Sequence, residues 1–282
     1  MPTSKSFISL FVIKEFMMFK ISPSDVEKAA KSQDMTRSDL KVPSSIILTF
    51  NRAILEELAK LCPNLVDWKW KGEIFSPYSS SRKSLKGSIE DSFDIAVFMP
   101  PMGASPLTAF SEELIYFGAK FIILACASWS LGKDYLSKGQ IQLPNFAIGF
   151  DGTSIHYGNK NWRIMSEPTA FNVLSKALDK VGANWKIGGV GACEAIYRIT
   201  PEVMKEFREK GCLSMENGEV ASLYSLAQIY KIPISVILQP YLDLEQGWNL
   251  EYMNEKYIES CKIQARVAIE AFKILQQQEL NQ

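Results

Sequence analysis

Short apolar segments alternate with amphipathic ones along most of this 282-residue chain, and this alternation limits the folds that it can adopt. Residues 120–127, KFIILACA, are almost continuously apolar, as expected of a strand that is covered on both faces. Residues 52–61 instead repeat their apolar side chains with helical spacing, and Pro63 follows them. Strands that alternate with helices predict one α/β domain with helices on both faces of a mixed sheet.

The same patterns predict the other elements. Strands are expected at residues 45–49, 93–99, 185–190 and 232–238, with a pair of strands joined by a turn at 146–157. Helices are expected at residues 106–117, 167–181, 201–210, 219–230 and 254–278. Residues 76–92 are rich in serine and in charge, which favours a surface loop or a hairpin tip.

The first forty residues show little of the apolar pattern that buried strands and helices leave in a sequence. We expect residues 1–40 to form a peripheral N-terminal extension and residues 41–282 to form a single domain. Residues 7–19 are apolar but too short to span a bilayer, and Lys14 and Glu15 interrupt them. Because no basic region or small-residue cleavage site accompanies them, we expect a packed or dispensable extension rather than a signal peptide or membrane anchor.

The charge and cysteine content exclude several classes of protein. Lys plus Arg and Asp plus Glu both number 31, so the chain has no global basic field for coating nucleic acid. Five scattered cysteines without a CxxC pair, together with a single histidine, argue against a zinc site. Reduced thiols fit a cytoplasmic protein, and we expect neither a nucleic-acid nor a membrane partner.

Two glycine-containing turns follow predicted strands. Residues 101–106, PMGASP, lead into a helix whose first N–H groups can meet a ligand, and residues 188–192, GGVGA, allow a close backbone approach. Each of these turns can bind a ligand or can be a tight turn with a structural role only. Neither fits the G-x-G-x-x-G or P-loop pattern, so the sequence supports neither a dinucleotide site nor a P-loop nucleotidase.

Isolated polar residues leave two interpretations open. His156 is either a satisfied structural group or a lone catalyst, and without a G-x-S-x-G motif it does not support a serine hydrolase. Glu216 and Glu219 flank an Asn-Gly pair at a predicted helix start. Their carboxylates complement the helix dipole there, or one of them binds both hydroxyls of a ribose diol.

Four segments, taken in order, resemble the nucleoside phosphorylase family that includes uridine phosphorylase and the hexameric purine nucleoside phosphorylases. Residues 101–132 resemble the family's Gly-rich turn, its EEL helix and its central strand. Residues 145–157, NFAIGFDGTSIHY, resemble its strand pair. Residues 181–197 resemble the approach to its base-binding Phe-Tyr, and residues 210–227, with MENGE, resemble the segment of its ribose-binding Glu-Met-Glu. The resemblance covers residues 45–240 of the chain.

This resemblance implies a three-layer α/β/α sandwich with a mixed, partly barrel-like central sheet. It implies reversible phosphorolysis of a nucleoside to its base and ribose 1-phosphate, the reaction of a pentosyltransferase, with phosphate as co-substrate and no cofactor. It implies a nucleoside or nucleobase as partner, and a homo-oligomer that is a dimer or a trimer of dimers. Catalysis in such a protein positions phosphate beneath C1′ and stabilises the departing base.

The resemblance also implies a set of site residues. Glu219 keeps the position of the ribose-binding glutamate. The base-binding positions fall on Tyr197, Gly218 and Thr200. The turns that line the pocket fall on Met102, Gly103, Cys126 and Ala127.

The phosphate site departs from the family pattern. The family's Gly-Asp-Pro-x-Arg motif aligns with FNRAI, where Ile54 replaces the arginine and Arg52 offers a weak substitute two positions away. The arginine of the central strand becomes Ile123, and Ala125 and Ser128 stand where glycines belong. A dianionic phosphate needs charge-assisted donors, and the two isoleucines supply none.

Two functions therefore stay open. One is an enzyme, a divergent phosphorylase or nucleoside hydrolase in which Arg52, Lys71 or Arg82 replaces the lost phosphate contacts. The other is a non-catalytic homologue that binds a nucleoside or base, or that partners an active paralogue. Phosphate binding discriminates between them, and we expect ordinary phosphorolysis of uridine or inosine to be very slow or absent. We also expect self-association, because a monomer would expose the tryptophans within residues 67–70.

Overall fold

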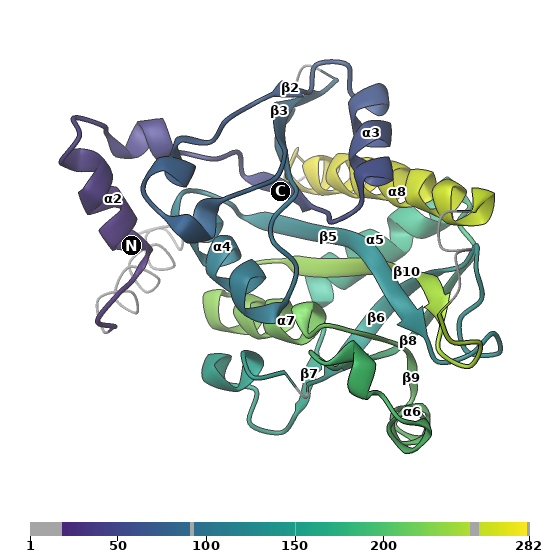
Figure 1. The fold of residues 1–282 in the computed structure, drawn as a ribbon. Helices are drawn as coiled ribbons and strands as arrows, with labels where there is room; N and C mark the ends of the chain where they lie inside the picture. The colour runs from purple at the N-terminus through teal and green to yellow at the C-terminus, as the bar shows by residue number, and fades with distance from the viewer. Residues whose placement is uncertain (1–18, 91–92, 150, 249–253, 281–282) are drawn as a thin grey trace, which may run out of the picture.

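A ten-stranded mixed sheet forms the centre of the fold (Figure 1). The computed structural model describes residues 19–90, 93–149, 151–248 and 254–280. The strands are β1 (Ser45–Leu48), β2 (Val66–Asp67), β3 (Ser84–Ile89), β4 (Phe93–Phe98), β5 (Phe121–Ser130), β6 (Ile141–Ile148), β7 (Arg163–Met165), β8 (Trp185–Ala192), β9 (Cys212–Glu216) and β10 (Ile234–Asp243).

Five of these strands close into a barrel. The order β10-β6-β8-β9-β5 returns to its start because β10 also pairs with β5. From β5 the sheet continues outward through β1, β4, β3 and β2. Strands β4, β1, β5 and β10 run parallel to one another, so the chain leaves them at the same edge of the sheet.

Helices cover both faces of the sheet. They are α2 (Pro23–Lys31), α3 (Arg52–Leu61), α4 (Ala104–Tyr116), α5 (Pro168–Val181), α6 (Pro201–Glu209), α7 (Glu219–Tyr230) and α8 (Glu255–Leu280). Helices α4 and α7 lie against one face, and α3, α5 and α8 lie together against the other (Figure 1). These layers confirm the predicted α/β/α sandwich with a mixed, partly barrel-like sheet.

The side chains of the central strands alternate between two cores. On β1, Ile46 and Leu48 pack in the core that contains α4 and α7, while Ile47 packs in the core that contains α3, α5 and α8. The same alternation continues on β5, where Ile122 and Ile123 enter opposite cores. Burial on both faces explains why these strands are almost continuously apolar.

Two segments differ from the sequence prediction. Residues 76–92 contain β3, which pairs antiparallel with β4, so the segment includes one arm of a hairpin rather than only a surface loop or a hairpin tip. Its alternating pattern is hidden by Gly87, which lies between the buried Leu85 and Ile89 and where a Cβ atom would come within 2.2 Å of the Asn64 carbonyl oxygen.

The prediction of a strand pair at residues 146–157 is also wrong for the second strand. Asp151 accepts hydrogen bonds from the backbone N–H groups of Thr153 (2.9 Å) and Ser154 (2.5 Å). These bonds turn the chain into a short 3-10 helix, η4 (Ser154–Tyr157), and the strand that pairs with β6 is β7, further along.

The described part of the N-terminal segment packs on the domain. Ala30 of α2 and Leu40 of η1 (Arg37–Leu40) are fully buried in the core that contains α4. Residues 7–18, most of the apolar segment discussed above, lie outside the described residues. The boundary at residue 40 stays a prediction. Within the described residues, no helix combines the length and the hydropathy that a membrane span requires.

Trp70 lies in the core, contrary to the expectation that a monomer would expose it. Its side chain has no exposed surface, and its indole N–H donates to the Leu40 carbonyl (2.8 Å). Its ring packs edge-on against Phe98, Phe110 and Phe117, with centroids 5.7–6.1 Å away. Trp68 is half-buried and its ring lies 5.7 Å from that of Phe98, so the tryptophan pair is not evidence for self-association.

We predict that Trp70→Ala lowers the free energy of unfolding by about 3–5 kcal/mol, because it removes a large buried ring and leaves the Leu40 carbonyl without its donor. Urea unfolding followed by circular dichroism measures the loss. Ile74→Ala is the control, because this side chain is 68% exposed and its removal should change stability by less than about 0.5 kcal/mol. Equal effects of the two substitutions would contradict the buried position of Trp70.

Candidate functional site

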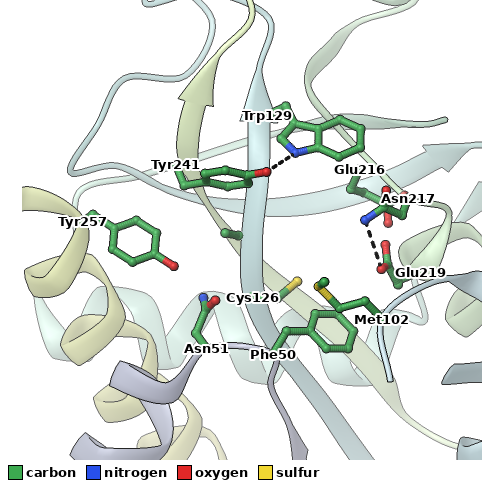
Figure 2. A pocket seen from close by; sticks show the side chains of 11 residues that line it. Phe50, Asn51, Met102, Cys126, Trp129, Glu216, Asn217, Glu219, Tyr241 and Tyr257 are labelled. Carbon is green, nitrogen blue, oxygen red and sulfur yellow. Dashed lines mark hydrogen bonds between the residues drawn. The ribbon is translucent and has the colours of Figure 1, made fainter. Parts of the chain in front are cut away.

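A cavity of about 240 Å³ opens where the parallel strands end, and eleven described residues line it (Figure 2). We call it the acidic cavity. It is bounded by the residues that precede α3, α4 and α7, by the later parts of β5 and β10, and by the start of α8. The lining residues are Phe50, Asn51, Met102, Cys126, Ala127, Trp129, Glu216, Asn217, Glu219, Tyr241 and Tyr257.

Glu219 connects two of the helix starts around the cavity. It is the first residue of α7, is 3% exposed, and accepts a hydrogen bond from the Gly103 N–H through Oε1 (2.9 Å). Gly103 precedes α4 with φ 109°, a conformation that favours glycine. The Glu219 carboxylate, at the start of α7, thus holds the turn that precedes α4 in place.

Gly218 lets the chain make this approach. Its φ is 90°, and a Cβ atom there would lie 2.6 Å from the Asp151 Cβ and 3.1 Å from the Ala104 Cβ. A side chain at this position would therefore push α7 away from α4. Gly218 has a structural reason to be glycine, whatever contact its backbone makes with a ligand.

Glu216 is a second buried carboxyl beside Glu219. It is 3% exposed, and its Oε2 accepts from the Val220 N–H (3.3 Å) in the first turn of α7. Within the described part of the chain, its Oε1 has no hydrogen-bond donor. Burial, and then the adjoining Glu219 carboxyl, raise the pKa of Glu216 well above the usual 4.5, so Glu216 holds a proton under conditions where exposed glutamates are ionised.

Four aromatic rings line other parts of the cavity. Figure 2 shows Tyr257 across the opening from the two glutamates, with Tyr241 and Trp129 along one edge and Phe50 along the other. The Trp129 indole N–H donates to the Tyr241 hydroxyl (2.8 Å), which fixes both rings. Burial raises the pKa of the Tyr257 hydroxyl, so this wall carries no negative charge at neutral pH.

The described lining of the acidic cavity contains no lysine, arginine or histidine. Arg52 turns outward to Glu56 (2.8 Å), and Lys71 pairs with Asp39 (2.7 Å). Arg82 is exposed, and its guanidinium is 3.5 Å from the Phe50 carbonyl oxygen. None of the three candidate replacements for the lost phosphate contacts lines the cavity.

The structure brings together most of the predicted pocket. Met102, Cys126, Ala127 and Glu219 all line the acidic cavity, and Gly103 is bonded to Glu219. Burial raises the pKa of the Cys126 thiol well above 9.0, so Cys126 contributes a neutral, weakly polar surface rather than a thiolate.

Two of the predicted base-binding residues lie elsewhere. Tyr197, on the 3-10 helix η5 (Ile196–Arg198), is 89% exposed, and Thr200 caps α6 by accepting from the Val203 N–H (3.3 Å). Neither is among the described residues that line the acidic cavity. Their roles toward a base stay predictions.

The positions that the family resemblance aligns with arginine and glycine lie in the packed interior. Ile54, Ile123 and Ala125 have no exposed surface and belong to the core that contains α3, α5 and α8. Ser128 is 1% exposed, and its hydroxyl is 3.4 Å from the Gln239 carbonyl oxygen. These side chains strengthen the core instead of lining the cavity.

Sequence reasoning did not assign the aromatic wall. Trp129 and Tyr241 lie in β5 and β10 beyond the ends of the apolar segments that predict these strands, and Tyr257 lies beyond the part of the chain that resembles the family. The alternation along β5 does not mark the site either, because Cys126 and Ala127 pack toward opposite cores and both line the cavity.

His156 lines a different hollow, of about 590 Å³, between η4 and α4. The histidine is exposed, and Glu194 in the same hollow accepts from the Gly152 N–H (3.1 Å). The geometry gives His156 no partner that would activate a nucleophile within the described hydrogen bonds. Among the described residues, no group of three histidine, cysteine, aspartate or glutamate side chains is placed to hold a metal ion.

Comparison with known proteins places this geometry in a family. The model of the phosphorylase superfamily matches residues 47–271. Among solved structures, the chain is similar to purine nucleoside phosphorylase from Toxoplasma gondii in complex with immucillin-H, with a TM-score of 0.72 and 19% sequence identity over 86% of this chain and 95% of that one. No protein in the curated set matches the sequence.

The chain therefore belongs to the phosphorylase superfamily, and its fold is that of a nucleoside phosphorylase. This confirms the resemblance drawn from the four sequence segments. The superfamily model ends within α8, so it includes Tyr257 at the aromatic wall as well as both glutamates.

We predict that Glu216 lowers the stability of the protein as the pH rises. A raised folded-state pKa means that the native state binds a proton more tightly than the unfolded state, so stability falls as the pH rises above about 4.5 toward the folded pKa. Glu216→Gln keeps the acceptor for the Val220 N–H but cannot ionise. Thermal unfolding between pH 5 and pH 9 should show the variant gaining stability over wild type as pH increases. A difference in melting temperature that does not change with pH would contradict the burial of this carboxyl as an ionisable group.

Proposed function

We propose that this protein binds a ribonucleoside with its ribose diol on Glu219, and that it does not catalyse phosphorolysis at an ordinary rate. The observation that carries the proposal is the position of Glu219. It lines the acidic cavity at the first residue of α7, is 3% exposed, and is oriented by the Gly103 N–H. A carboxylate held in this way can accept both hydroxyls of a vicinal diol.

The second part of the proposal rests on what occupies the helix starts. Backbone N–H groups at the beginning of a helix are the usual place for a phosphate, because they combine free donors with the positive end of the dipole. Here the Gly103 N–H already donates to Glu219, and the Val220 N–H already donates to Glu216. The protein's own carboxyls thus occupy two of the donors that an external anion could use at the starts of α4 and α7.

The charge of the cavity also disfavours phosphate binding. Phosphate must lose its water before it can attack C1′, which is costly unless charged donors replace that water. The described lining offers two carboxyls and no cationic side chain. Losing a single preorganised donor typically costs about 10²–10³ in rate, and here two arginine positions are isoleucine.

The remaining expectations belong to this proposal as well. Binding needs no cofactor, and in a phosphorolytic relative phosphate would be the co-substrate. All five cysteines are free, which supports the interpretation of reduced thiols in the cytoplasm. Self-association into a dimer or a trimer of dimers is supported by the family, and the exposed ring of Tyr197 offers a surface that a second copy can cover.

We predict that Glu219→Gln weakens the binding of adenosine or uridine by about 10- to 100-fold. The charge-assisted hydrogen bonds to the diol become neutral ones, while the glutamine oxygen still accepts from the Gly103 N–H. Isothermal titration calorimetry measures both affinities. The 2′,3′-dideoxy analogue is the control, because it lacks both hydroxyls and should bind wild type and variant alike. If wild type and Glu219→Gln bind the ribonucleoside equally, or if wild type binds neither nucleoside, the proposed function is wrong.

A further inference from the structure

A further hollow in the protein has the opposite charge to the acidic cavity. It measures about 270 Å³, and its described lining contains three lysines, Lys133, Lys138 and Lys256. We call it the lysine hollow. Asp243 is the single acidic side chain in that lining. Because Lys plus Arg and Asp plus Glu both number 31 in the whole chain, this excess of positive charge is local, and the proposed function does not use it.

The lysine hollow and the acidic cavity are built on neighbouring residues of the same two strands. Trp129 of β5 and Tyr241 of β10 line the acidic cavity, while the residues that follow them, Ser130 and Leu242, line the lysine hollow. Successive side chains of a strand point to opposite sides, which explains this division. No described residue lines both spaces, so a ligand in the lysine hollow does not meet the two glutamates of the acidic cavity.

Two of the three lysines are not neutralised by the protein. Lys133 and Lys256 are exposed, and within the described part of the chain neither has a carboxylate at ion-pair distance. Asp243 does not take this role. It is 8% exposed, and its Oδ1 accepts a hydrogen bond from the Glu245 N–H instead (2.9 Å). The positive charge of the lysine hollow is therefore available to a ligand.

Lys256 lies where a positive charge is unfavourable. It is the second residue of α8, a helix of 26 residues, and the beginning of a helix is the positive end of its dipole. Lysines that line one small hollow also repel one another, because like charges at short range raise the energy of the folded state. A bound anion would offset both effects at once.

Hydrogen bonds hold the loop after β5, which carries two of the three lysines, in one conformation. The Ser130 hydroxyl donates to the Leu136 carbonyl (2.7 Å), and the Ser137 hydroxyl donates to the Lys133 carbonyl (2.5 Å). A loop that is ordered before a ligand arrives loses less conformational freedom on binding. The backbone that positions these lysines is thus formed in advance.

We propose that the lysine hollow binds a small, doubly charged oxyanion such as phosphate or sulfate. Each lysine ammonium supplies three donors, and a tetrahedral oxyanion accepts from several charged donors at once. The volume of about 270 Å³ lies below the range of about 300–1,000 Å³ that is usual for drug-sized ligands, which favours a small ion. This inference goes beyond the proposed function and does not depend on it, because the anion is bound apart from the ribose and does not reach C1′.

Titration calorimetry of the full-length protein with sulfate and with inorganic phosphate tests the inference. Both are measured at pH 7.5, with sodium chloride keeping the ionic strength constant so that general screening does not change. Each anion should bind saturably, with a dissociation constant of about 1 mM or below, and each should displace the other.

Three single variants locate the anion. Lys133→Gln and Lys256→Gln each remove one ammonium from the lysine hollow, and each should weaken sulfate binding at least about fivefold. Lys176→Gln is the matched control, because this exposed lysine of α5 does not line the lysine hollow and its replacement changes the net charge equally. The control should alter the affinity less than about twofold, and circular dichroism confirms that each variant is folded.

The outcomes are distinct for the two proposals. Absence of saturable binding by wild type, or unchanged binding in both lysine-hollow variants, overturns the inference. Equal weakening in all three variants overturns it too, since only net charge would then matter. Saturating sulfate should leave the affinity for uridine within about twofold, whereas competition between the two would place the anion in the acidic cavity and overturn the separate site. Sulfate binding without any nucleoside binding supports the lysine hollow and contradicts the proposed function.

Discussion

The hydrogen bond from the Gly103 N–H to Glu219 holds the candidate site together. It joins the start of α4 to the start of α7, and Gly103 and Gly218, both with positive φ, are the residues that permit the approach. The two helices pack on the same face of the sheet. The bond therefore also fixes the positions of their first residues beside the cavity at the ends of the parallel strands. The buried carboxylate is acceptable in this place because a backbone donor and the positive end of a helix dipole replace its water.

The chemistry of the cavity follows from that arrangement. Glu219 and Glu216 occupy two N–H groups at the starts of α4 and α7, and the described lining offers an external anion no basic side chain. The superfamily fold is therefore retained, while the positions that the family resemblance aligns with phosphate ligands lie in a hydrophobic core. Ile54 and Ile123 show this change most directly, since both are fully buried against α3, α5 and α8.

Much of the fold could be predicted from the sequence, because continuous apolar strands and amphipathic helices each leave a periodic pattern, and α3 and α7 have the predicted bounds. The two wrong predictions have local causes. Gly87 interrupts the apolar alternation of β3, and the hydrogen bonds of the Asp151 side chain form a 3-10 turn where a β-hairpin turn was expected. The position of Glu219 at the cavity could be predicted because the final glutamate of the family's motif is present in the sequence. The aromatic wall could not, since Tyr257 reaches the cavity through the packing of α8, and no local pattern records that contact.

We propose that this superfamily member does not use phosphate as a co-substrate at an ordinary rate. The most direct test is the release of uracil and hypoxanthine from a wide nucleoside panel, measured with and without inorganic phosphate. We predict that phosphate-dependent release of either base stays well below about 1 s⁻¹, the lower range of ordinary enzymes. Turnover at about that rate or faster, strictly dependent on phosphate, would show that the anion site lies elsewhere in the protein and would contradict the account.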